Sequence, residues 1–506
     1  MGSFEAFASA VSQLVDPFSV VLLLGGVLLG TIIGVLPGLG APIAITIALP
    51  FTLYMEPVPA FVLLLAIYSA ATYGGSISAI TLGIPGTGSA AATVEDGHKM
   101  FKSGRGGEAL GLSLTASIIG GLFSTVALAL LAPMLARIAV EFGPLEYLAI
   151  SVFGIIVVVR VAEKSLVKGL VSACIGIWLT TWGIDNISGA ERYIFNNYNL
   201  YEGLPFVAVL VGVFAVSELL MSSERTLPPV DFGAKSLKAS LPTLGILKKF
   251  RATLARSSVL GTIIGILPGE GAAVGAFFSY AEAKRRSDTP EKFGTGIPEG
   301  VVAPEAANNA TVGGALVPTL TLGIPGSPAA AVLLGAFLIQ GLAPGPKLFS
   351  EAPDLMYAIF ISLFVINIVM LFTGLLTIRA AARIITIPQQ VIVPTVMLLC
   401  LIGVFSVKND LFGVTVLICV GAFGYVLRKL KYAIAPFTIG FVLGPILERS
   451  FRQSYLLGDG TLIGFFESWI AVLIYGLLVL TVAGGPVLNF IRKQRGAASS
   501  RGQNNV

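Results

Sequence analysis

Runs of about twenty almost uncharged residues follow one another along this chain and limit its fold more than any other feature. Examples are 17–37, 110–132 and 463–482. A helix needs about 20 apolar residues to cross the hydrocarbon core of a bilayer. Only 12% of the 506 residues are charged, roughly half the share typical of a soluble protein. The sequence therefore predicts an all-α, polytopic membrane protein with about 11–12 membrane spans.

The charged residues that do occur indicate topology. The net charge of +5 is spread over loops and the C-terminal tail, so it does not indicate nucleic-acid binding. The three cysteines, Cys174, Cys400 and Cys419, are isolated in apolar segments, and we expect them to be small packing residues. Residues 1–16 contain no Lys or Arg, so they lack the basic region of a cleaved signal peptide.

Three motifs occur twice, in the same order and at similar spacing. GTIIGVLPG at 30–38 returns as GTIIGILPG at 261–269, and TLGIPG at 81–86 returns unchanged at 321–326. Just before the latter, TYGG at 72–75 pairs with TVGG at 311–314. Chance in apolar sequence does not produce three ordered matches, so we predict an internal duplication.

Basic residues then place the second motif in the membrane. The segments 222–256 and 284–292 are rich in Lys and Arg, which marks both as cytoplasmic, whereas 184–204 has a single basic residue and is expected outside. Because both its ends lie inside, 257–281 cannot cross the bilayer once. We expect a re-entrant hairpin with LPGEG at its tip, followed by a helix over 312–325.

Alternation of the remaining segments gives two repeats of inverted topology. We assign 17–204 to the first transmembrane repeat, 205–256 to a linker span and cytoplasmic loop, and 257–431 to the second repeat. Two C-terminal spans follow in 432–490, and 491–506 is a cytoplasmic tail. Arg428 and its basic neighbours serve in this scheme as markers of the cytoplasmic side.

Inverted repeats with interrupted helices are typical of secondary transporters. Four Pro-Gly breaks fit this pattern: 37–40 (PGLG), 83–86 (GIPG), 268–271 (PGEG) and 323–326 (GIPG). Each break frees backbone groups that are costly to leave unpaired in hydrocarbon. Half-helix N-termini suit a carboxylate or phosphate, and unwound carbonyls suit Na⁺.

The breaks and the small polar residues beside them are the candidate substrate-binding positions. The alternative for each of these small residues is close helix packing. The candidates are Gly38, Gly40, Ser76, Ser78, Thr81, Pro85, Gly86, Gly269, Gly271, Asn308, Asn309, Thr311, Thr321, Pro325, Gly326 and Ser327.

Several ionisable residues need separate interpretation. Glu270, at the tip of the second hairpin, is the candidate ion-coupling group, because an ionisable group at membrane depth is a functional hypothesis by default. Glu299 and Glu305 follow prolines and are expected in a cytoplasmic loop. The run 95–97 is expected to end the segment after the first GIPG break. His98 is the sole histidine, and no metal site is predicted.

Signatures of other functions are missing from the sequence. There is no GxxxxGK[ST] nucleotide-binding loop and no GxSxG, HExxH or CxxC arrangement, so we do not expect an enzyme or a bound cofactor. Transport energy would come from an ion gradient or from another chain. The alternatives are a channel, or a scaffold subunit of a larger complex.

At these motifs the chain resembles a known family. GTIIGVLPGLG, TYGGSISAITLGIPGTGSAAATVEDGHKM, GILPGEGAA and PEAANNATVGGALVPTLTLGIPGSPAAA resemble the large membrane subunit of the tripartite tricarboxylate transporters, the TctA family. The specific motifs span about 23–348. The resemblance implies that the PGLG, PGEG and GIPG loops contact substrate.

The same resemblance implies partners and a location. It implies a small four-span membrane subunit (TctB-like) and a periplasmic substrate-binding protein (TctC-like). It also implies import of di- and tricarboxylates or related organic acids with Na⁺ or H⁺, across the bacterial inner membrane. The leading hypothesis is thus the permease subunit of a cation-coupled secondary transporter.

Overall fold

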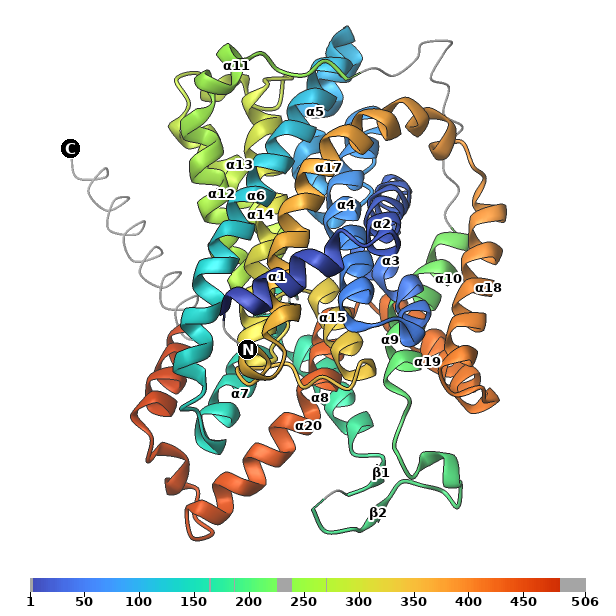
Figure 1. The fold of residues 1–506 in the computed structure, drawn as a ribbon, viewed down its shortest axis with the longest axis vertical. Coiled ribbons are helices and arrows are strands. Elements are labelled where there is room, and N and C mark those ends of the chain that lie inside the picture. Colours follow the sequence, from blue (N-terminus) through green and yellow to red (C-terminus); the bar gives the residue numbers. More distant parts are fainter. Residues whose placement is uncertain (1–2, 163–164, 186, 225–238, 270, 483–506) are drawn as a thin grey trace, which may run out of the picture.

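The computed structural model describes residues 3–162, 165–185, 187–224, 239–269 and 271–482 (Figure 1). Within these ranges the chain is almost entirely helical, with one two-stranded hairpin formed by β1 (Gly183–Ile184) and β2 (Glu191–Arg192). Nine helices of this part are long and apolar enough to cross a membrane, and four shorter apolar helices accompany them. The predicted all-α polytopic membrane fold is confirmed.

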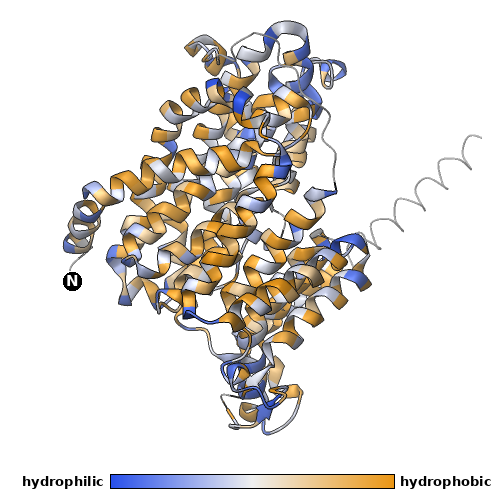
Figure 2. Cartoon of the chain, turned by 90° about the vertical axis from the view of Figure 1, so that its right-hand side faces the viewer, coloured by the Kyte–Doolittle hydropathy of each residue, from blue (hydrophilic) through white to orange (hydrophobic). Residues whose placement is uncertain are grey.

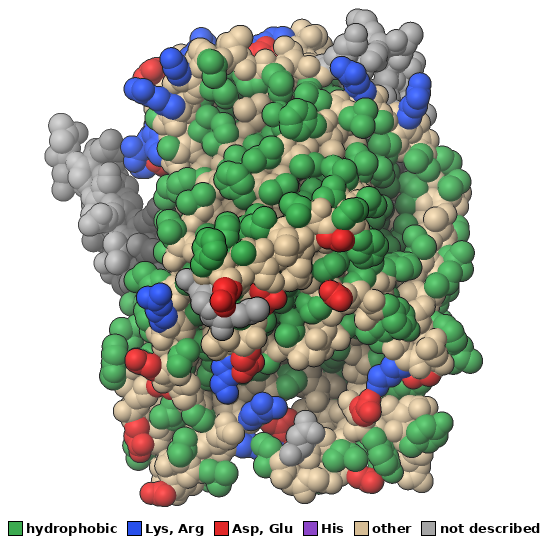
Figure 3. All heavy atoms as spheres, in the orientation of Figure 1, with side chains coloured by type: hydrophobic (Ala, Val, Ile, Leu, Met, Phe, Trp, Pro, Cys, Tyr) green, Lys and Arg blue, Asp and Glu red, His purple; other side chains and the backbone are tan. Residues whose placement is uncertain are grey.

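The surface of the molecule is that of a protein surrounded by lipid. Hydrophobic residues predominate along the middle of the ribbon in Figure 2. On the face shown in Figure 3, hydrophobic side chains predominate over the middle with a few acidic ones among them, Lys and Arg gather at one end, and charges of both signs lie at the other. The peripheral helix α18 (Gln389–Lys408) has a mean hydropathy of 2.3 in its most apolar window, yet only 17% of that window is buried. Apolar side chains in such a position are stable only against lipid or another protein.

The polar segments predicted on opposite sides of the membrane lie at opposite ends of the long axis. The short helix α11 (Leu244–Lys249) is at the upper end of Figure 1, and the β1–β2 hairpin is at the lower end. At that lower end Arg452 lies 2.7 Å from Asp185, and Arg192 lies 2.6 Å from Glu448. Hydrogen bonds from Ser188 and Arg452 hold the pKa of Asp185 well below its usual range.

The first half of the chain is built on helices that begin at prolines. Proline suits the first turn of a helix because its missing N–H would be unpaired there anyway. α2 starts at Pro17 behind an Asp16 cap, and α4 starts at Pro57. The elements are α1 (Ser3–Leu14), α2 (Pro17–Val35), α3 (Ala41–Ala48), the 3₁₀ helix Leu49–Tyr54, α4 (Pro57–Leu82), the 3₁₀ helix Gly88–Ala90, α5 (Ala91–Met100), the π-helical turn Phe101–Arg105, α6 (Gly106–Ala139), α7 (Pro144–Ala162) and α8 (Leu166–Thr180).

The hairpin predicted for the second half is present. α12 (Arg251–Ile266) and α13 (Gly271–Arg286) run antiparallel: Ser279 donates a hydrogen bond of 2.7 Å to Ser257. Gly275 lies against Gly261, and Gly271 against Gly265, on the same face. The chain reverses direction between the end of α12 at Ile266 and the start of α13 at Gly271, as the LPGEG motif predicts.

The two helices that carry the GIPG breaks form the centre of the molecule. α4 and α14 (Glu299–Leu322) both end at a glycine in the left-handed conformation, Gly83 at φ 72° and Gly323 at φ 69°. In α4, 94% of the apolar window is buried, and in α14 every residue from Gly300 to Thr321 is buried. The irregular backbone after α14 is buried from Gly323 to Ser327, whereas residues 83–85 after α4 are half-buried.

The start of α14 differs from the prediction. We expected a helix from residue 312 and a loop around Glu299 and Glu305, but the helix begins at Glu299 and contains Pro304. Proline is tolerated within membrane helices because neighbouring groups satisfy the freed carbonyl. The prediction that residues 95–97 end a segment was also wrong, since they lie inside α5.

The remaining helices surround this centre. They are α9 (Phe206–Val211), a π-helical turn (Gly212–Val216) and α10 (Ser217–Ser223) in one continuous span, α15 (Pro328–Ile339), α16 (Leu348–Glu351), α17 (Pro353–Ile385), α18, α19 (Leu411–Lys429) and α20 (Ile434–Leu457). Short 3₁₀ helices cover Tyr198–Leu200, Pro290–Lys292 and Ile463–Phe466, and a last apolar helix covers Trp469–Val482. The repeat boundaries and their inversion stay predictions, and residues 225–238, 270 and 483–506 lie outside the described residues.

Candidate functional site

The Pro-Gly breaks of each half contact one another. In the first half the amide of Gly38 donates to the carbonyl of Gly86 at 3.3 Å, and in the second the amide of Gly269 donates to the carbonyl of Gly326 at 3.2 Å. Gly38 has φ 89° and Gly269 φ 133°, conformations that favour glycine. The repeated motifs thus encode one repeated backbone contact, which we call the crossing of each half.

Close packing behind each crossing fixes which residues of the two halves correspond. A Cβ added at Gly74 would lie 2.6 Å from the Thr31 carbonyl oxygen, and one at Gly314 would lie 2.4 Å from that of Thr262. Gly74 and Gly314 are therefore equivalent, 240 residues apart like the two TLGIPG motifs. The predicted match of TYGG with TVGG is wrong by one residue.

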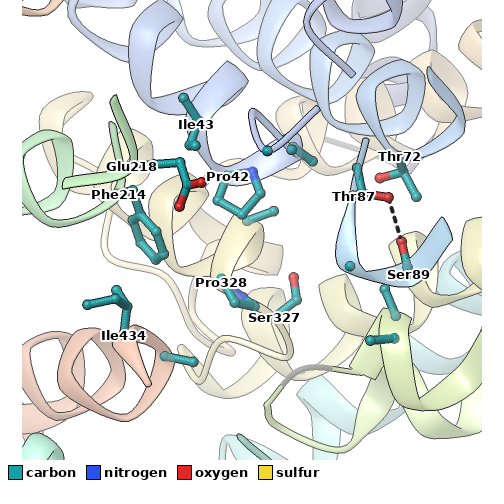
Figure 4. Close-up of a pocket in the computed structure, with 18 of the residues that line it drawn as sticks. Pro42, Ile43, Thr72, Thr87, Ser89, Phe214, Glu218, Ser327, Pro328 and Ile434 are labelled. Atoms are coloured by element: carbon teal, nitrogen blue, oxygen red, sulfur yellow. Dashed lines mark hydrogen bonds between the residues drawn. The ribbon is translucent and has the colours of Figure 1, made fainter. Parts of the chain in front are cut away.

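A cavity of about 540 Å³ lies beside the crossings and is lined by both halves (Figure 4). The first half contributes Gly38 and the start of α3, the loop from Pro85 to Ser89, and Tyr68 and Thr72 of α4. The second contributes the starts of α13 and α15, Gly271–Ala273 and Ser327–Ala329. Phe214, Glu218, Arg428 and the chain from Tyr432 to Ala435 complete the wall.

Four helices present their N-termini to this cavity. The first residues of α3, α13 and α15 line it, as do Ile434 and Ala435 at the start of α20. The first N–H groups of a helix have no partner within it, and the helix end carries about half a positive charge. An anion in the cavity would therefore meet unpaired donors and a favourable potential from several directions.

One ion pair lies in the wall. Arg428, in the last turn of α19, lies 2.7 Å from a carboxylate oxygen of Glu218 on α10, and its Nε donates to Ser217 at 2.9 Å. The Glu218 side chain is 7% exposed and that of Arg428 25% exposed, so the guanidinium is the more accessible partner. A second anion that enters the cavity can compete with Glu218 for Arg428.

Hydroxyl groups supply further polar contacts. The Tyr68 hydroxyl lies 2.9 Å from that of Ser327, which joins α4 of the first half to the cap of α15 in the second. Thr87 and Ser89 lie 3.0 Å apart beside the first crossing (Figure 4). These groups can donate or accept, so they can adapt to a ligand with several carboxylate oxygens.

Six of the predicted site residues line the cavity: five come from three of the breaks, and one directly follows the fourth. They are Gly38, Gly40, Pro85, Gly86, Gly271 and Ser327. Gly269 and Gly326 form the second crossing behind the wall, where Pro325 is buried beside them. Glu270 lies outside the described residues.

The other predicted residues lie deeper in the helices. The Ser78, Thr81, Thr311 and Thr321 hydroxyls each donate to a carbonyl of their own helix. Asn308 donates to the carbonyl of Thr72 at 3.2 Å, and Asn309 is buried. Ser76 donates to Glu305, which is fully buried instead of lying in the predicted loop.

Sequence reasoning missed Arg428, Glu218, Tyr68 and the start of α20 as wall residues. Arg428 was interpreted only as a marker of the cytoplasmic side, because a basic residue after an apolar run usually has that meaning. A glutamate inside the apolar run 205–221 was the available signal for Glu218, since such a residue needs a partner.

Interrupted helices whose N-termini meet at a polar cavity inside a helical membrane bundle are the architecture of secondary transporters. Comparison with known sequences agrees with this class. The chain belongs to the tripartite tricarboxylate transporter TctA family, whose sequence profile matches residues 20–439. The resemblance predicted from the motifs is confirmed.

Two relatives come from Agrobacterium vitis. An uncharacterized 52.8 kDa protein in the TAR-I ttuC' 3' region is 36% identical over 485 residues, which is 95% of each chain. An uncharacterized protein in the TAR-II ttuC' 3' region is 37% identical over 222 residues, covering 44% of this chain and 92% of the relative. No solved structure matches.

Proposed function

We propose that this chain is the permease subunit of a tripartite secondary transporter that imports di- or tricarboxylates, with the 540 Å³ cavity as the substrate site. One observation carries the proposal: helix N-termini from both halves and the guanidinium of Arg428 face the same cavity. A multiply charged carboxylate is the kind of ligand that such a set of donors binds.

The ion pair in the wall allows Arg428 to have one partner in the empty site and another when substrate is bound. Without substrate, Glu218 satisfies Arg428, because an unpaired charge away from water is strongly unfavourable. A substrate carboxylate takes the guanidinium, whose planar donors fit two carboxylate oxygens. Release of the substrate restores the pair with Glu218. Binding is thus an exchange of partners at Arg428.

Transport follows if the two halves move relative to each other around this shared cavity, which opens it to either side of the membrane. The inward direction, energy from a Na⁺ or H⁺ gradient and a location in the bacterial inner membrane belong to the same proposal. The proposal also includes capture of substrate by a periplasmic binding protein and assembly with a small four-span subunit.

Uptake by proteoliposomes that contain all three subunits tests the proposal. A panel of mono-, di- and tricarboxylates and their neutral amides is offered, with Na⁺ and pH gradients imposed separately. We expect gradient-driven accumulation of one or more polycarboxylates and none of the amides. Absence of any carboxylate uptake, or equal uptake of the amides, contradicts the proposal.

Variants of Arg428 connect the uptake to the cavity. Loss of one partner of a buried charge pair typically costs about 2–5 kcal/mol, so Arg428→Gln should lower uptake at least about 30-fold. Arg428→Lys keeps the charge but loses the planar donors and should lose less. Normal uptake by Arg428→Gln would exclude this side chain from the site.

A further inference from the structure

The carboxylate of Glu305 lies in the buried centre of the molecule, and this residue does not line the cavity. Glu305 of α14 is fully buried and accepts hydrogen bonds from hydroxyls on three other helices. Ser76 of α4 lies 2.6 Å from both carboxylate oxygens, Ser117 of α6 donates to Oε2 at 3.0 Å, and Thr93 of α5 donates to Oε1. Four helices thus meet at this group.

Glu305 has hydroxyl partners but no basic partner. In the described part of the chain, no Lys, Arg or His forms an ion pair with it. An ionised carboxylate without a countercharge is strongly unfavourable in such surroundings, even when it accepts several hydrogen bonds. Glu305 therefore needs a positive charge from solution, either a bound proton or a metal cation.

Unpartnered polar atoms surround the same region. The hydroxyl of Tyr73, the amide oxygen of Asn308 and both amide atoms of Asn309 are buried and have no hydrogen-bond partner among the residues that the structure describes. Buried polar atoms are normally paired, and exceptions often mark sites of water molecules or ions. Asn308 and Asn309 follow Glu305 by three and four residues on α14. Tyr73 follows Thr72 on the facing helix α4.

Two successive contacts connect Glu305 to the substrate cavity. Thr72 lines the cavity, and its carbonyl accepts a hydrogen bond from Asn308. Ser76 lies one turn after Thr72 on α4, and Glu305 lies one turn before Asn308 on α14. Ser76 donates a hydrogen bond to Glu305. A helical turn advances about 5.4 Å, so the carboxylate lies close behind the cavity wall.

We propose that Glu305 is the residue that takes up and releases a coupling proton during transport. The inference rests on the proposed function, since it assigns the coupling group of that transporter. Proton uptake converts the carboxylate to a neutral carboxylic acid, and release to water on the other side of the membrane restores the carboxylate. No other bond changes.

The surroundings favour a proton over Na⁺. Glu305 lies inside a continuous helix, whereas Na⁺ sites in such proteins use carbonyls of unwound segments. The O–H groups of Ser76, Thr93 and Ser117 already donate to the carboxylate lone pairs that a metal cation would need. A proton needs no additional space.

Electrostatic repulsion couples proton binding at Glu305 to substrate binding in the cavity. Two negative charges about 10 Å apart at an effective dielectric constant of about 20 repel enough to change an affinity roughly tenfold. An anion in the cavity therefore favours protonated Glu305, and protonated Glu305 favours the anion to the same extent. This reciprocity is what symport requires.

Other titratable groups lie on the helices that pack against Glu305. Tyr73 faces Glu305 from α4, and α6 contributes the hydroxyls of Ser113 and Ser117. On α5, Asp96 accepts from Tyr280 and from the backbone amides of residues 294, 296 and 297. Nδ1 of His98 contacts the Ile80 carbonyl oxygen. Glu95 is on α5 as well, and Glu299 on α14 accepts from Thr253.

Two modes of transport separate the proton step from substrate binding. Exchange of labelled for unlabelled substrate requires no net proton movement, whereas accumulation driven by a pH gradient does. Glu305→Gln, tested with its partner subunits in proteoliposomes, should keep exchange within about threefold of the wild-type rate and lose pH-driven accumulation. Glu270→Gln, the variant of the coupling candidate predicted from the sequence, should retain accumulation.

Accumulation by Glu305→Gln like that of the wild type overturns the assignment, while the proposed function stands. Accumulation driven by Na⁺ alone in the wild type also overturns the assignment of Glu305. Wild-type protein that neither exchanges nor accumulates carboxylates contradicts the proposed function instead.

A second variant covers the case in which Glu305→Gln does not fold. Ser117→Ala removes one donor that stabilises the carboxylate, so the midpoint of the pH profile of uptake should move to higher pH by about half a unit or more. Ser124→Ala is the matched control, since its hydroxyl is equally buried in α6 but donates to Gly121. Identical profiles for wild type and Ser117→Ala would contradict the proposal.

Discussion

The two crossings share one backbone contact but have different surroundings. Gly38 and Gly86 of the first crossing line the cavity themselves. Gly269 and Gly326 of the second do not, and that half reaches the cavity through the next helix starts, at Gly271 and Ser327. Duplication thus preserved the frame of the site, while the two copies came to occupy different positions relative to the cavity.

Side chains on the two central helices differ in the same way. With Gly74 equivalent to Gly314, Tyr68 corresponds to Asn308 and Leu65 to Glu305. Tyr68 faces the cavity and contacts Ser327, whereas Asn308 and Glu305 contact α4 in the buried centre. On these two helices, therefore, the first half turns a side chain toward the substrate cavity, whereas the second carries the proposed coupling charge.

The largest expected effect comes from adding a methyl group at each crossing. The Cβ of Gly86→Ala would lie 2.1 Å from the Gly34 carbonyl oxygen, and that of Gly326→Ala 2.6 Å from the Cα of Ala315. Backbone atoms cannot move aside as side chains can, so we expect uptake to fall about 100-fold for Gly86→Ala and about tenfold for Gly326→Ala.

Transport assays at equal protein amounts measure this difference, with Gly25→Ala as the control, because nothing lies within 4 Å of its added Cβ. A Gly326→Ala variant that loses more than Gly86→Ala would reverse the assignment of the two halves.

A middle-sized effect is expected at the equivalent positions Tyr68 and Asn308. Tyr68→Phe removes a hydroxyl from the cavity wall and should raise the KM for substrate about fivefold, the value of one hydrogen bond. Asn308→Ala should leave KM within about twofold and lower the accumulated concentration, because it disturbs the contact beside Glu305. Equal changes of KM in both variants would remove the distinction between the halves.

The smallest effect is expected at Thr81 and Thr321, which are equivalent and were both predicted to bind substrate. Each hydroxyl donates at 2.7 Å to a carbonyl of its own helix, Ile77 or Val317, and neither residue lines the cavity. Thr81→Val and Thr321→Val should therefore change uptake by no more than about twofold. A tenfold loss in either would show that the hydroxyl turns toward substrate during transport.

The sequence was informative wherever function required a particular backbone. Proline and glycine at the breaks report local conformation, so the four interruptions, the second hairpin and the family could be predicted from motifs alone. Six of the sixteen predicted binding residues line the cavity, since the motifs locate the breaks but not which face of a neighbouring helix turns toward them.

Contacts between distant segments were harder to predict from the sequence. Arg428 follows an ordinary apolar run, and only the fold brings it to Glu218, more than two hundred residues away. Glu305 follows Pro304, a context typical of a loop. In the structure it lies inside α14, and three hydroxyls from other helices donate hydrogen bonds to its carboxylate. The one-residue error in matching TYGG with TVGG arose because GG pairs align equally well in two registers.

Protection of two engineered cysteines tests the shared cavity most directly. Ala41→Cys of the first half and Ala273→Cys of the second both lie in its wall, and Cys174, Cys400 and Cys419 are first replaced by alanine. We predict that a transported carboxylate slows labelling by a small thiol reagent at least about fivefold at both positions, while its neutral amide has no effect. Unchanged labelling at both positions, or protection at only one, in protein that still transports would contradict a substrate site built by the two halves together.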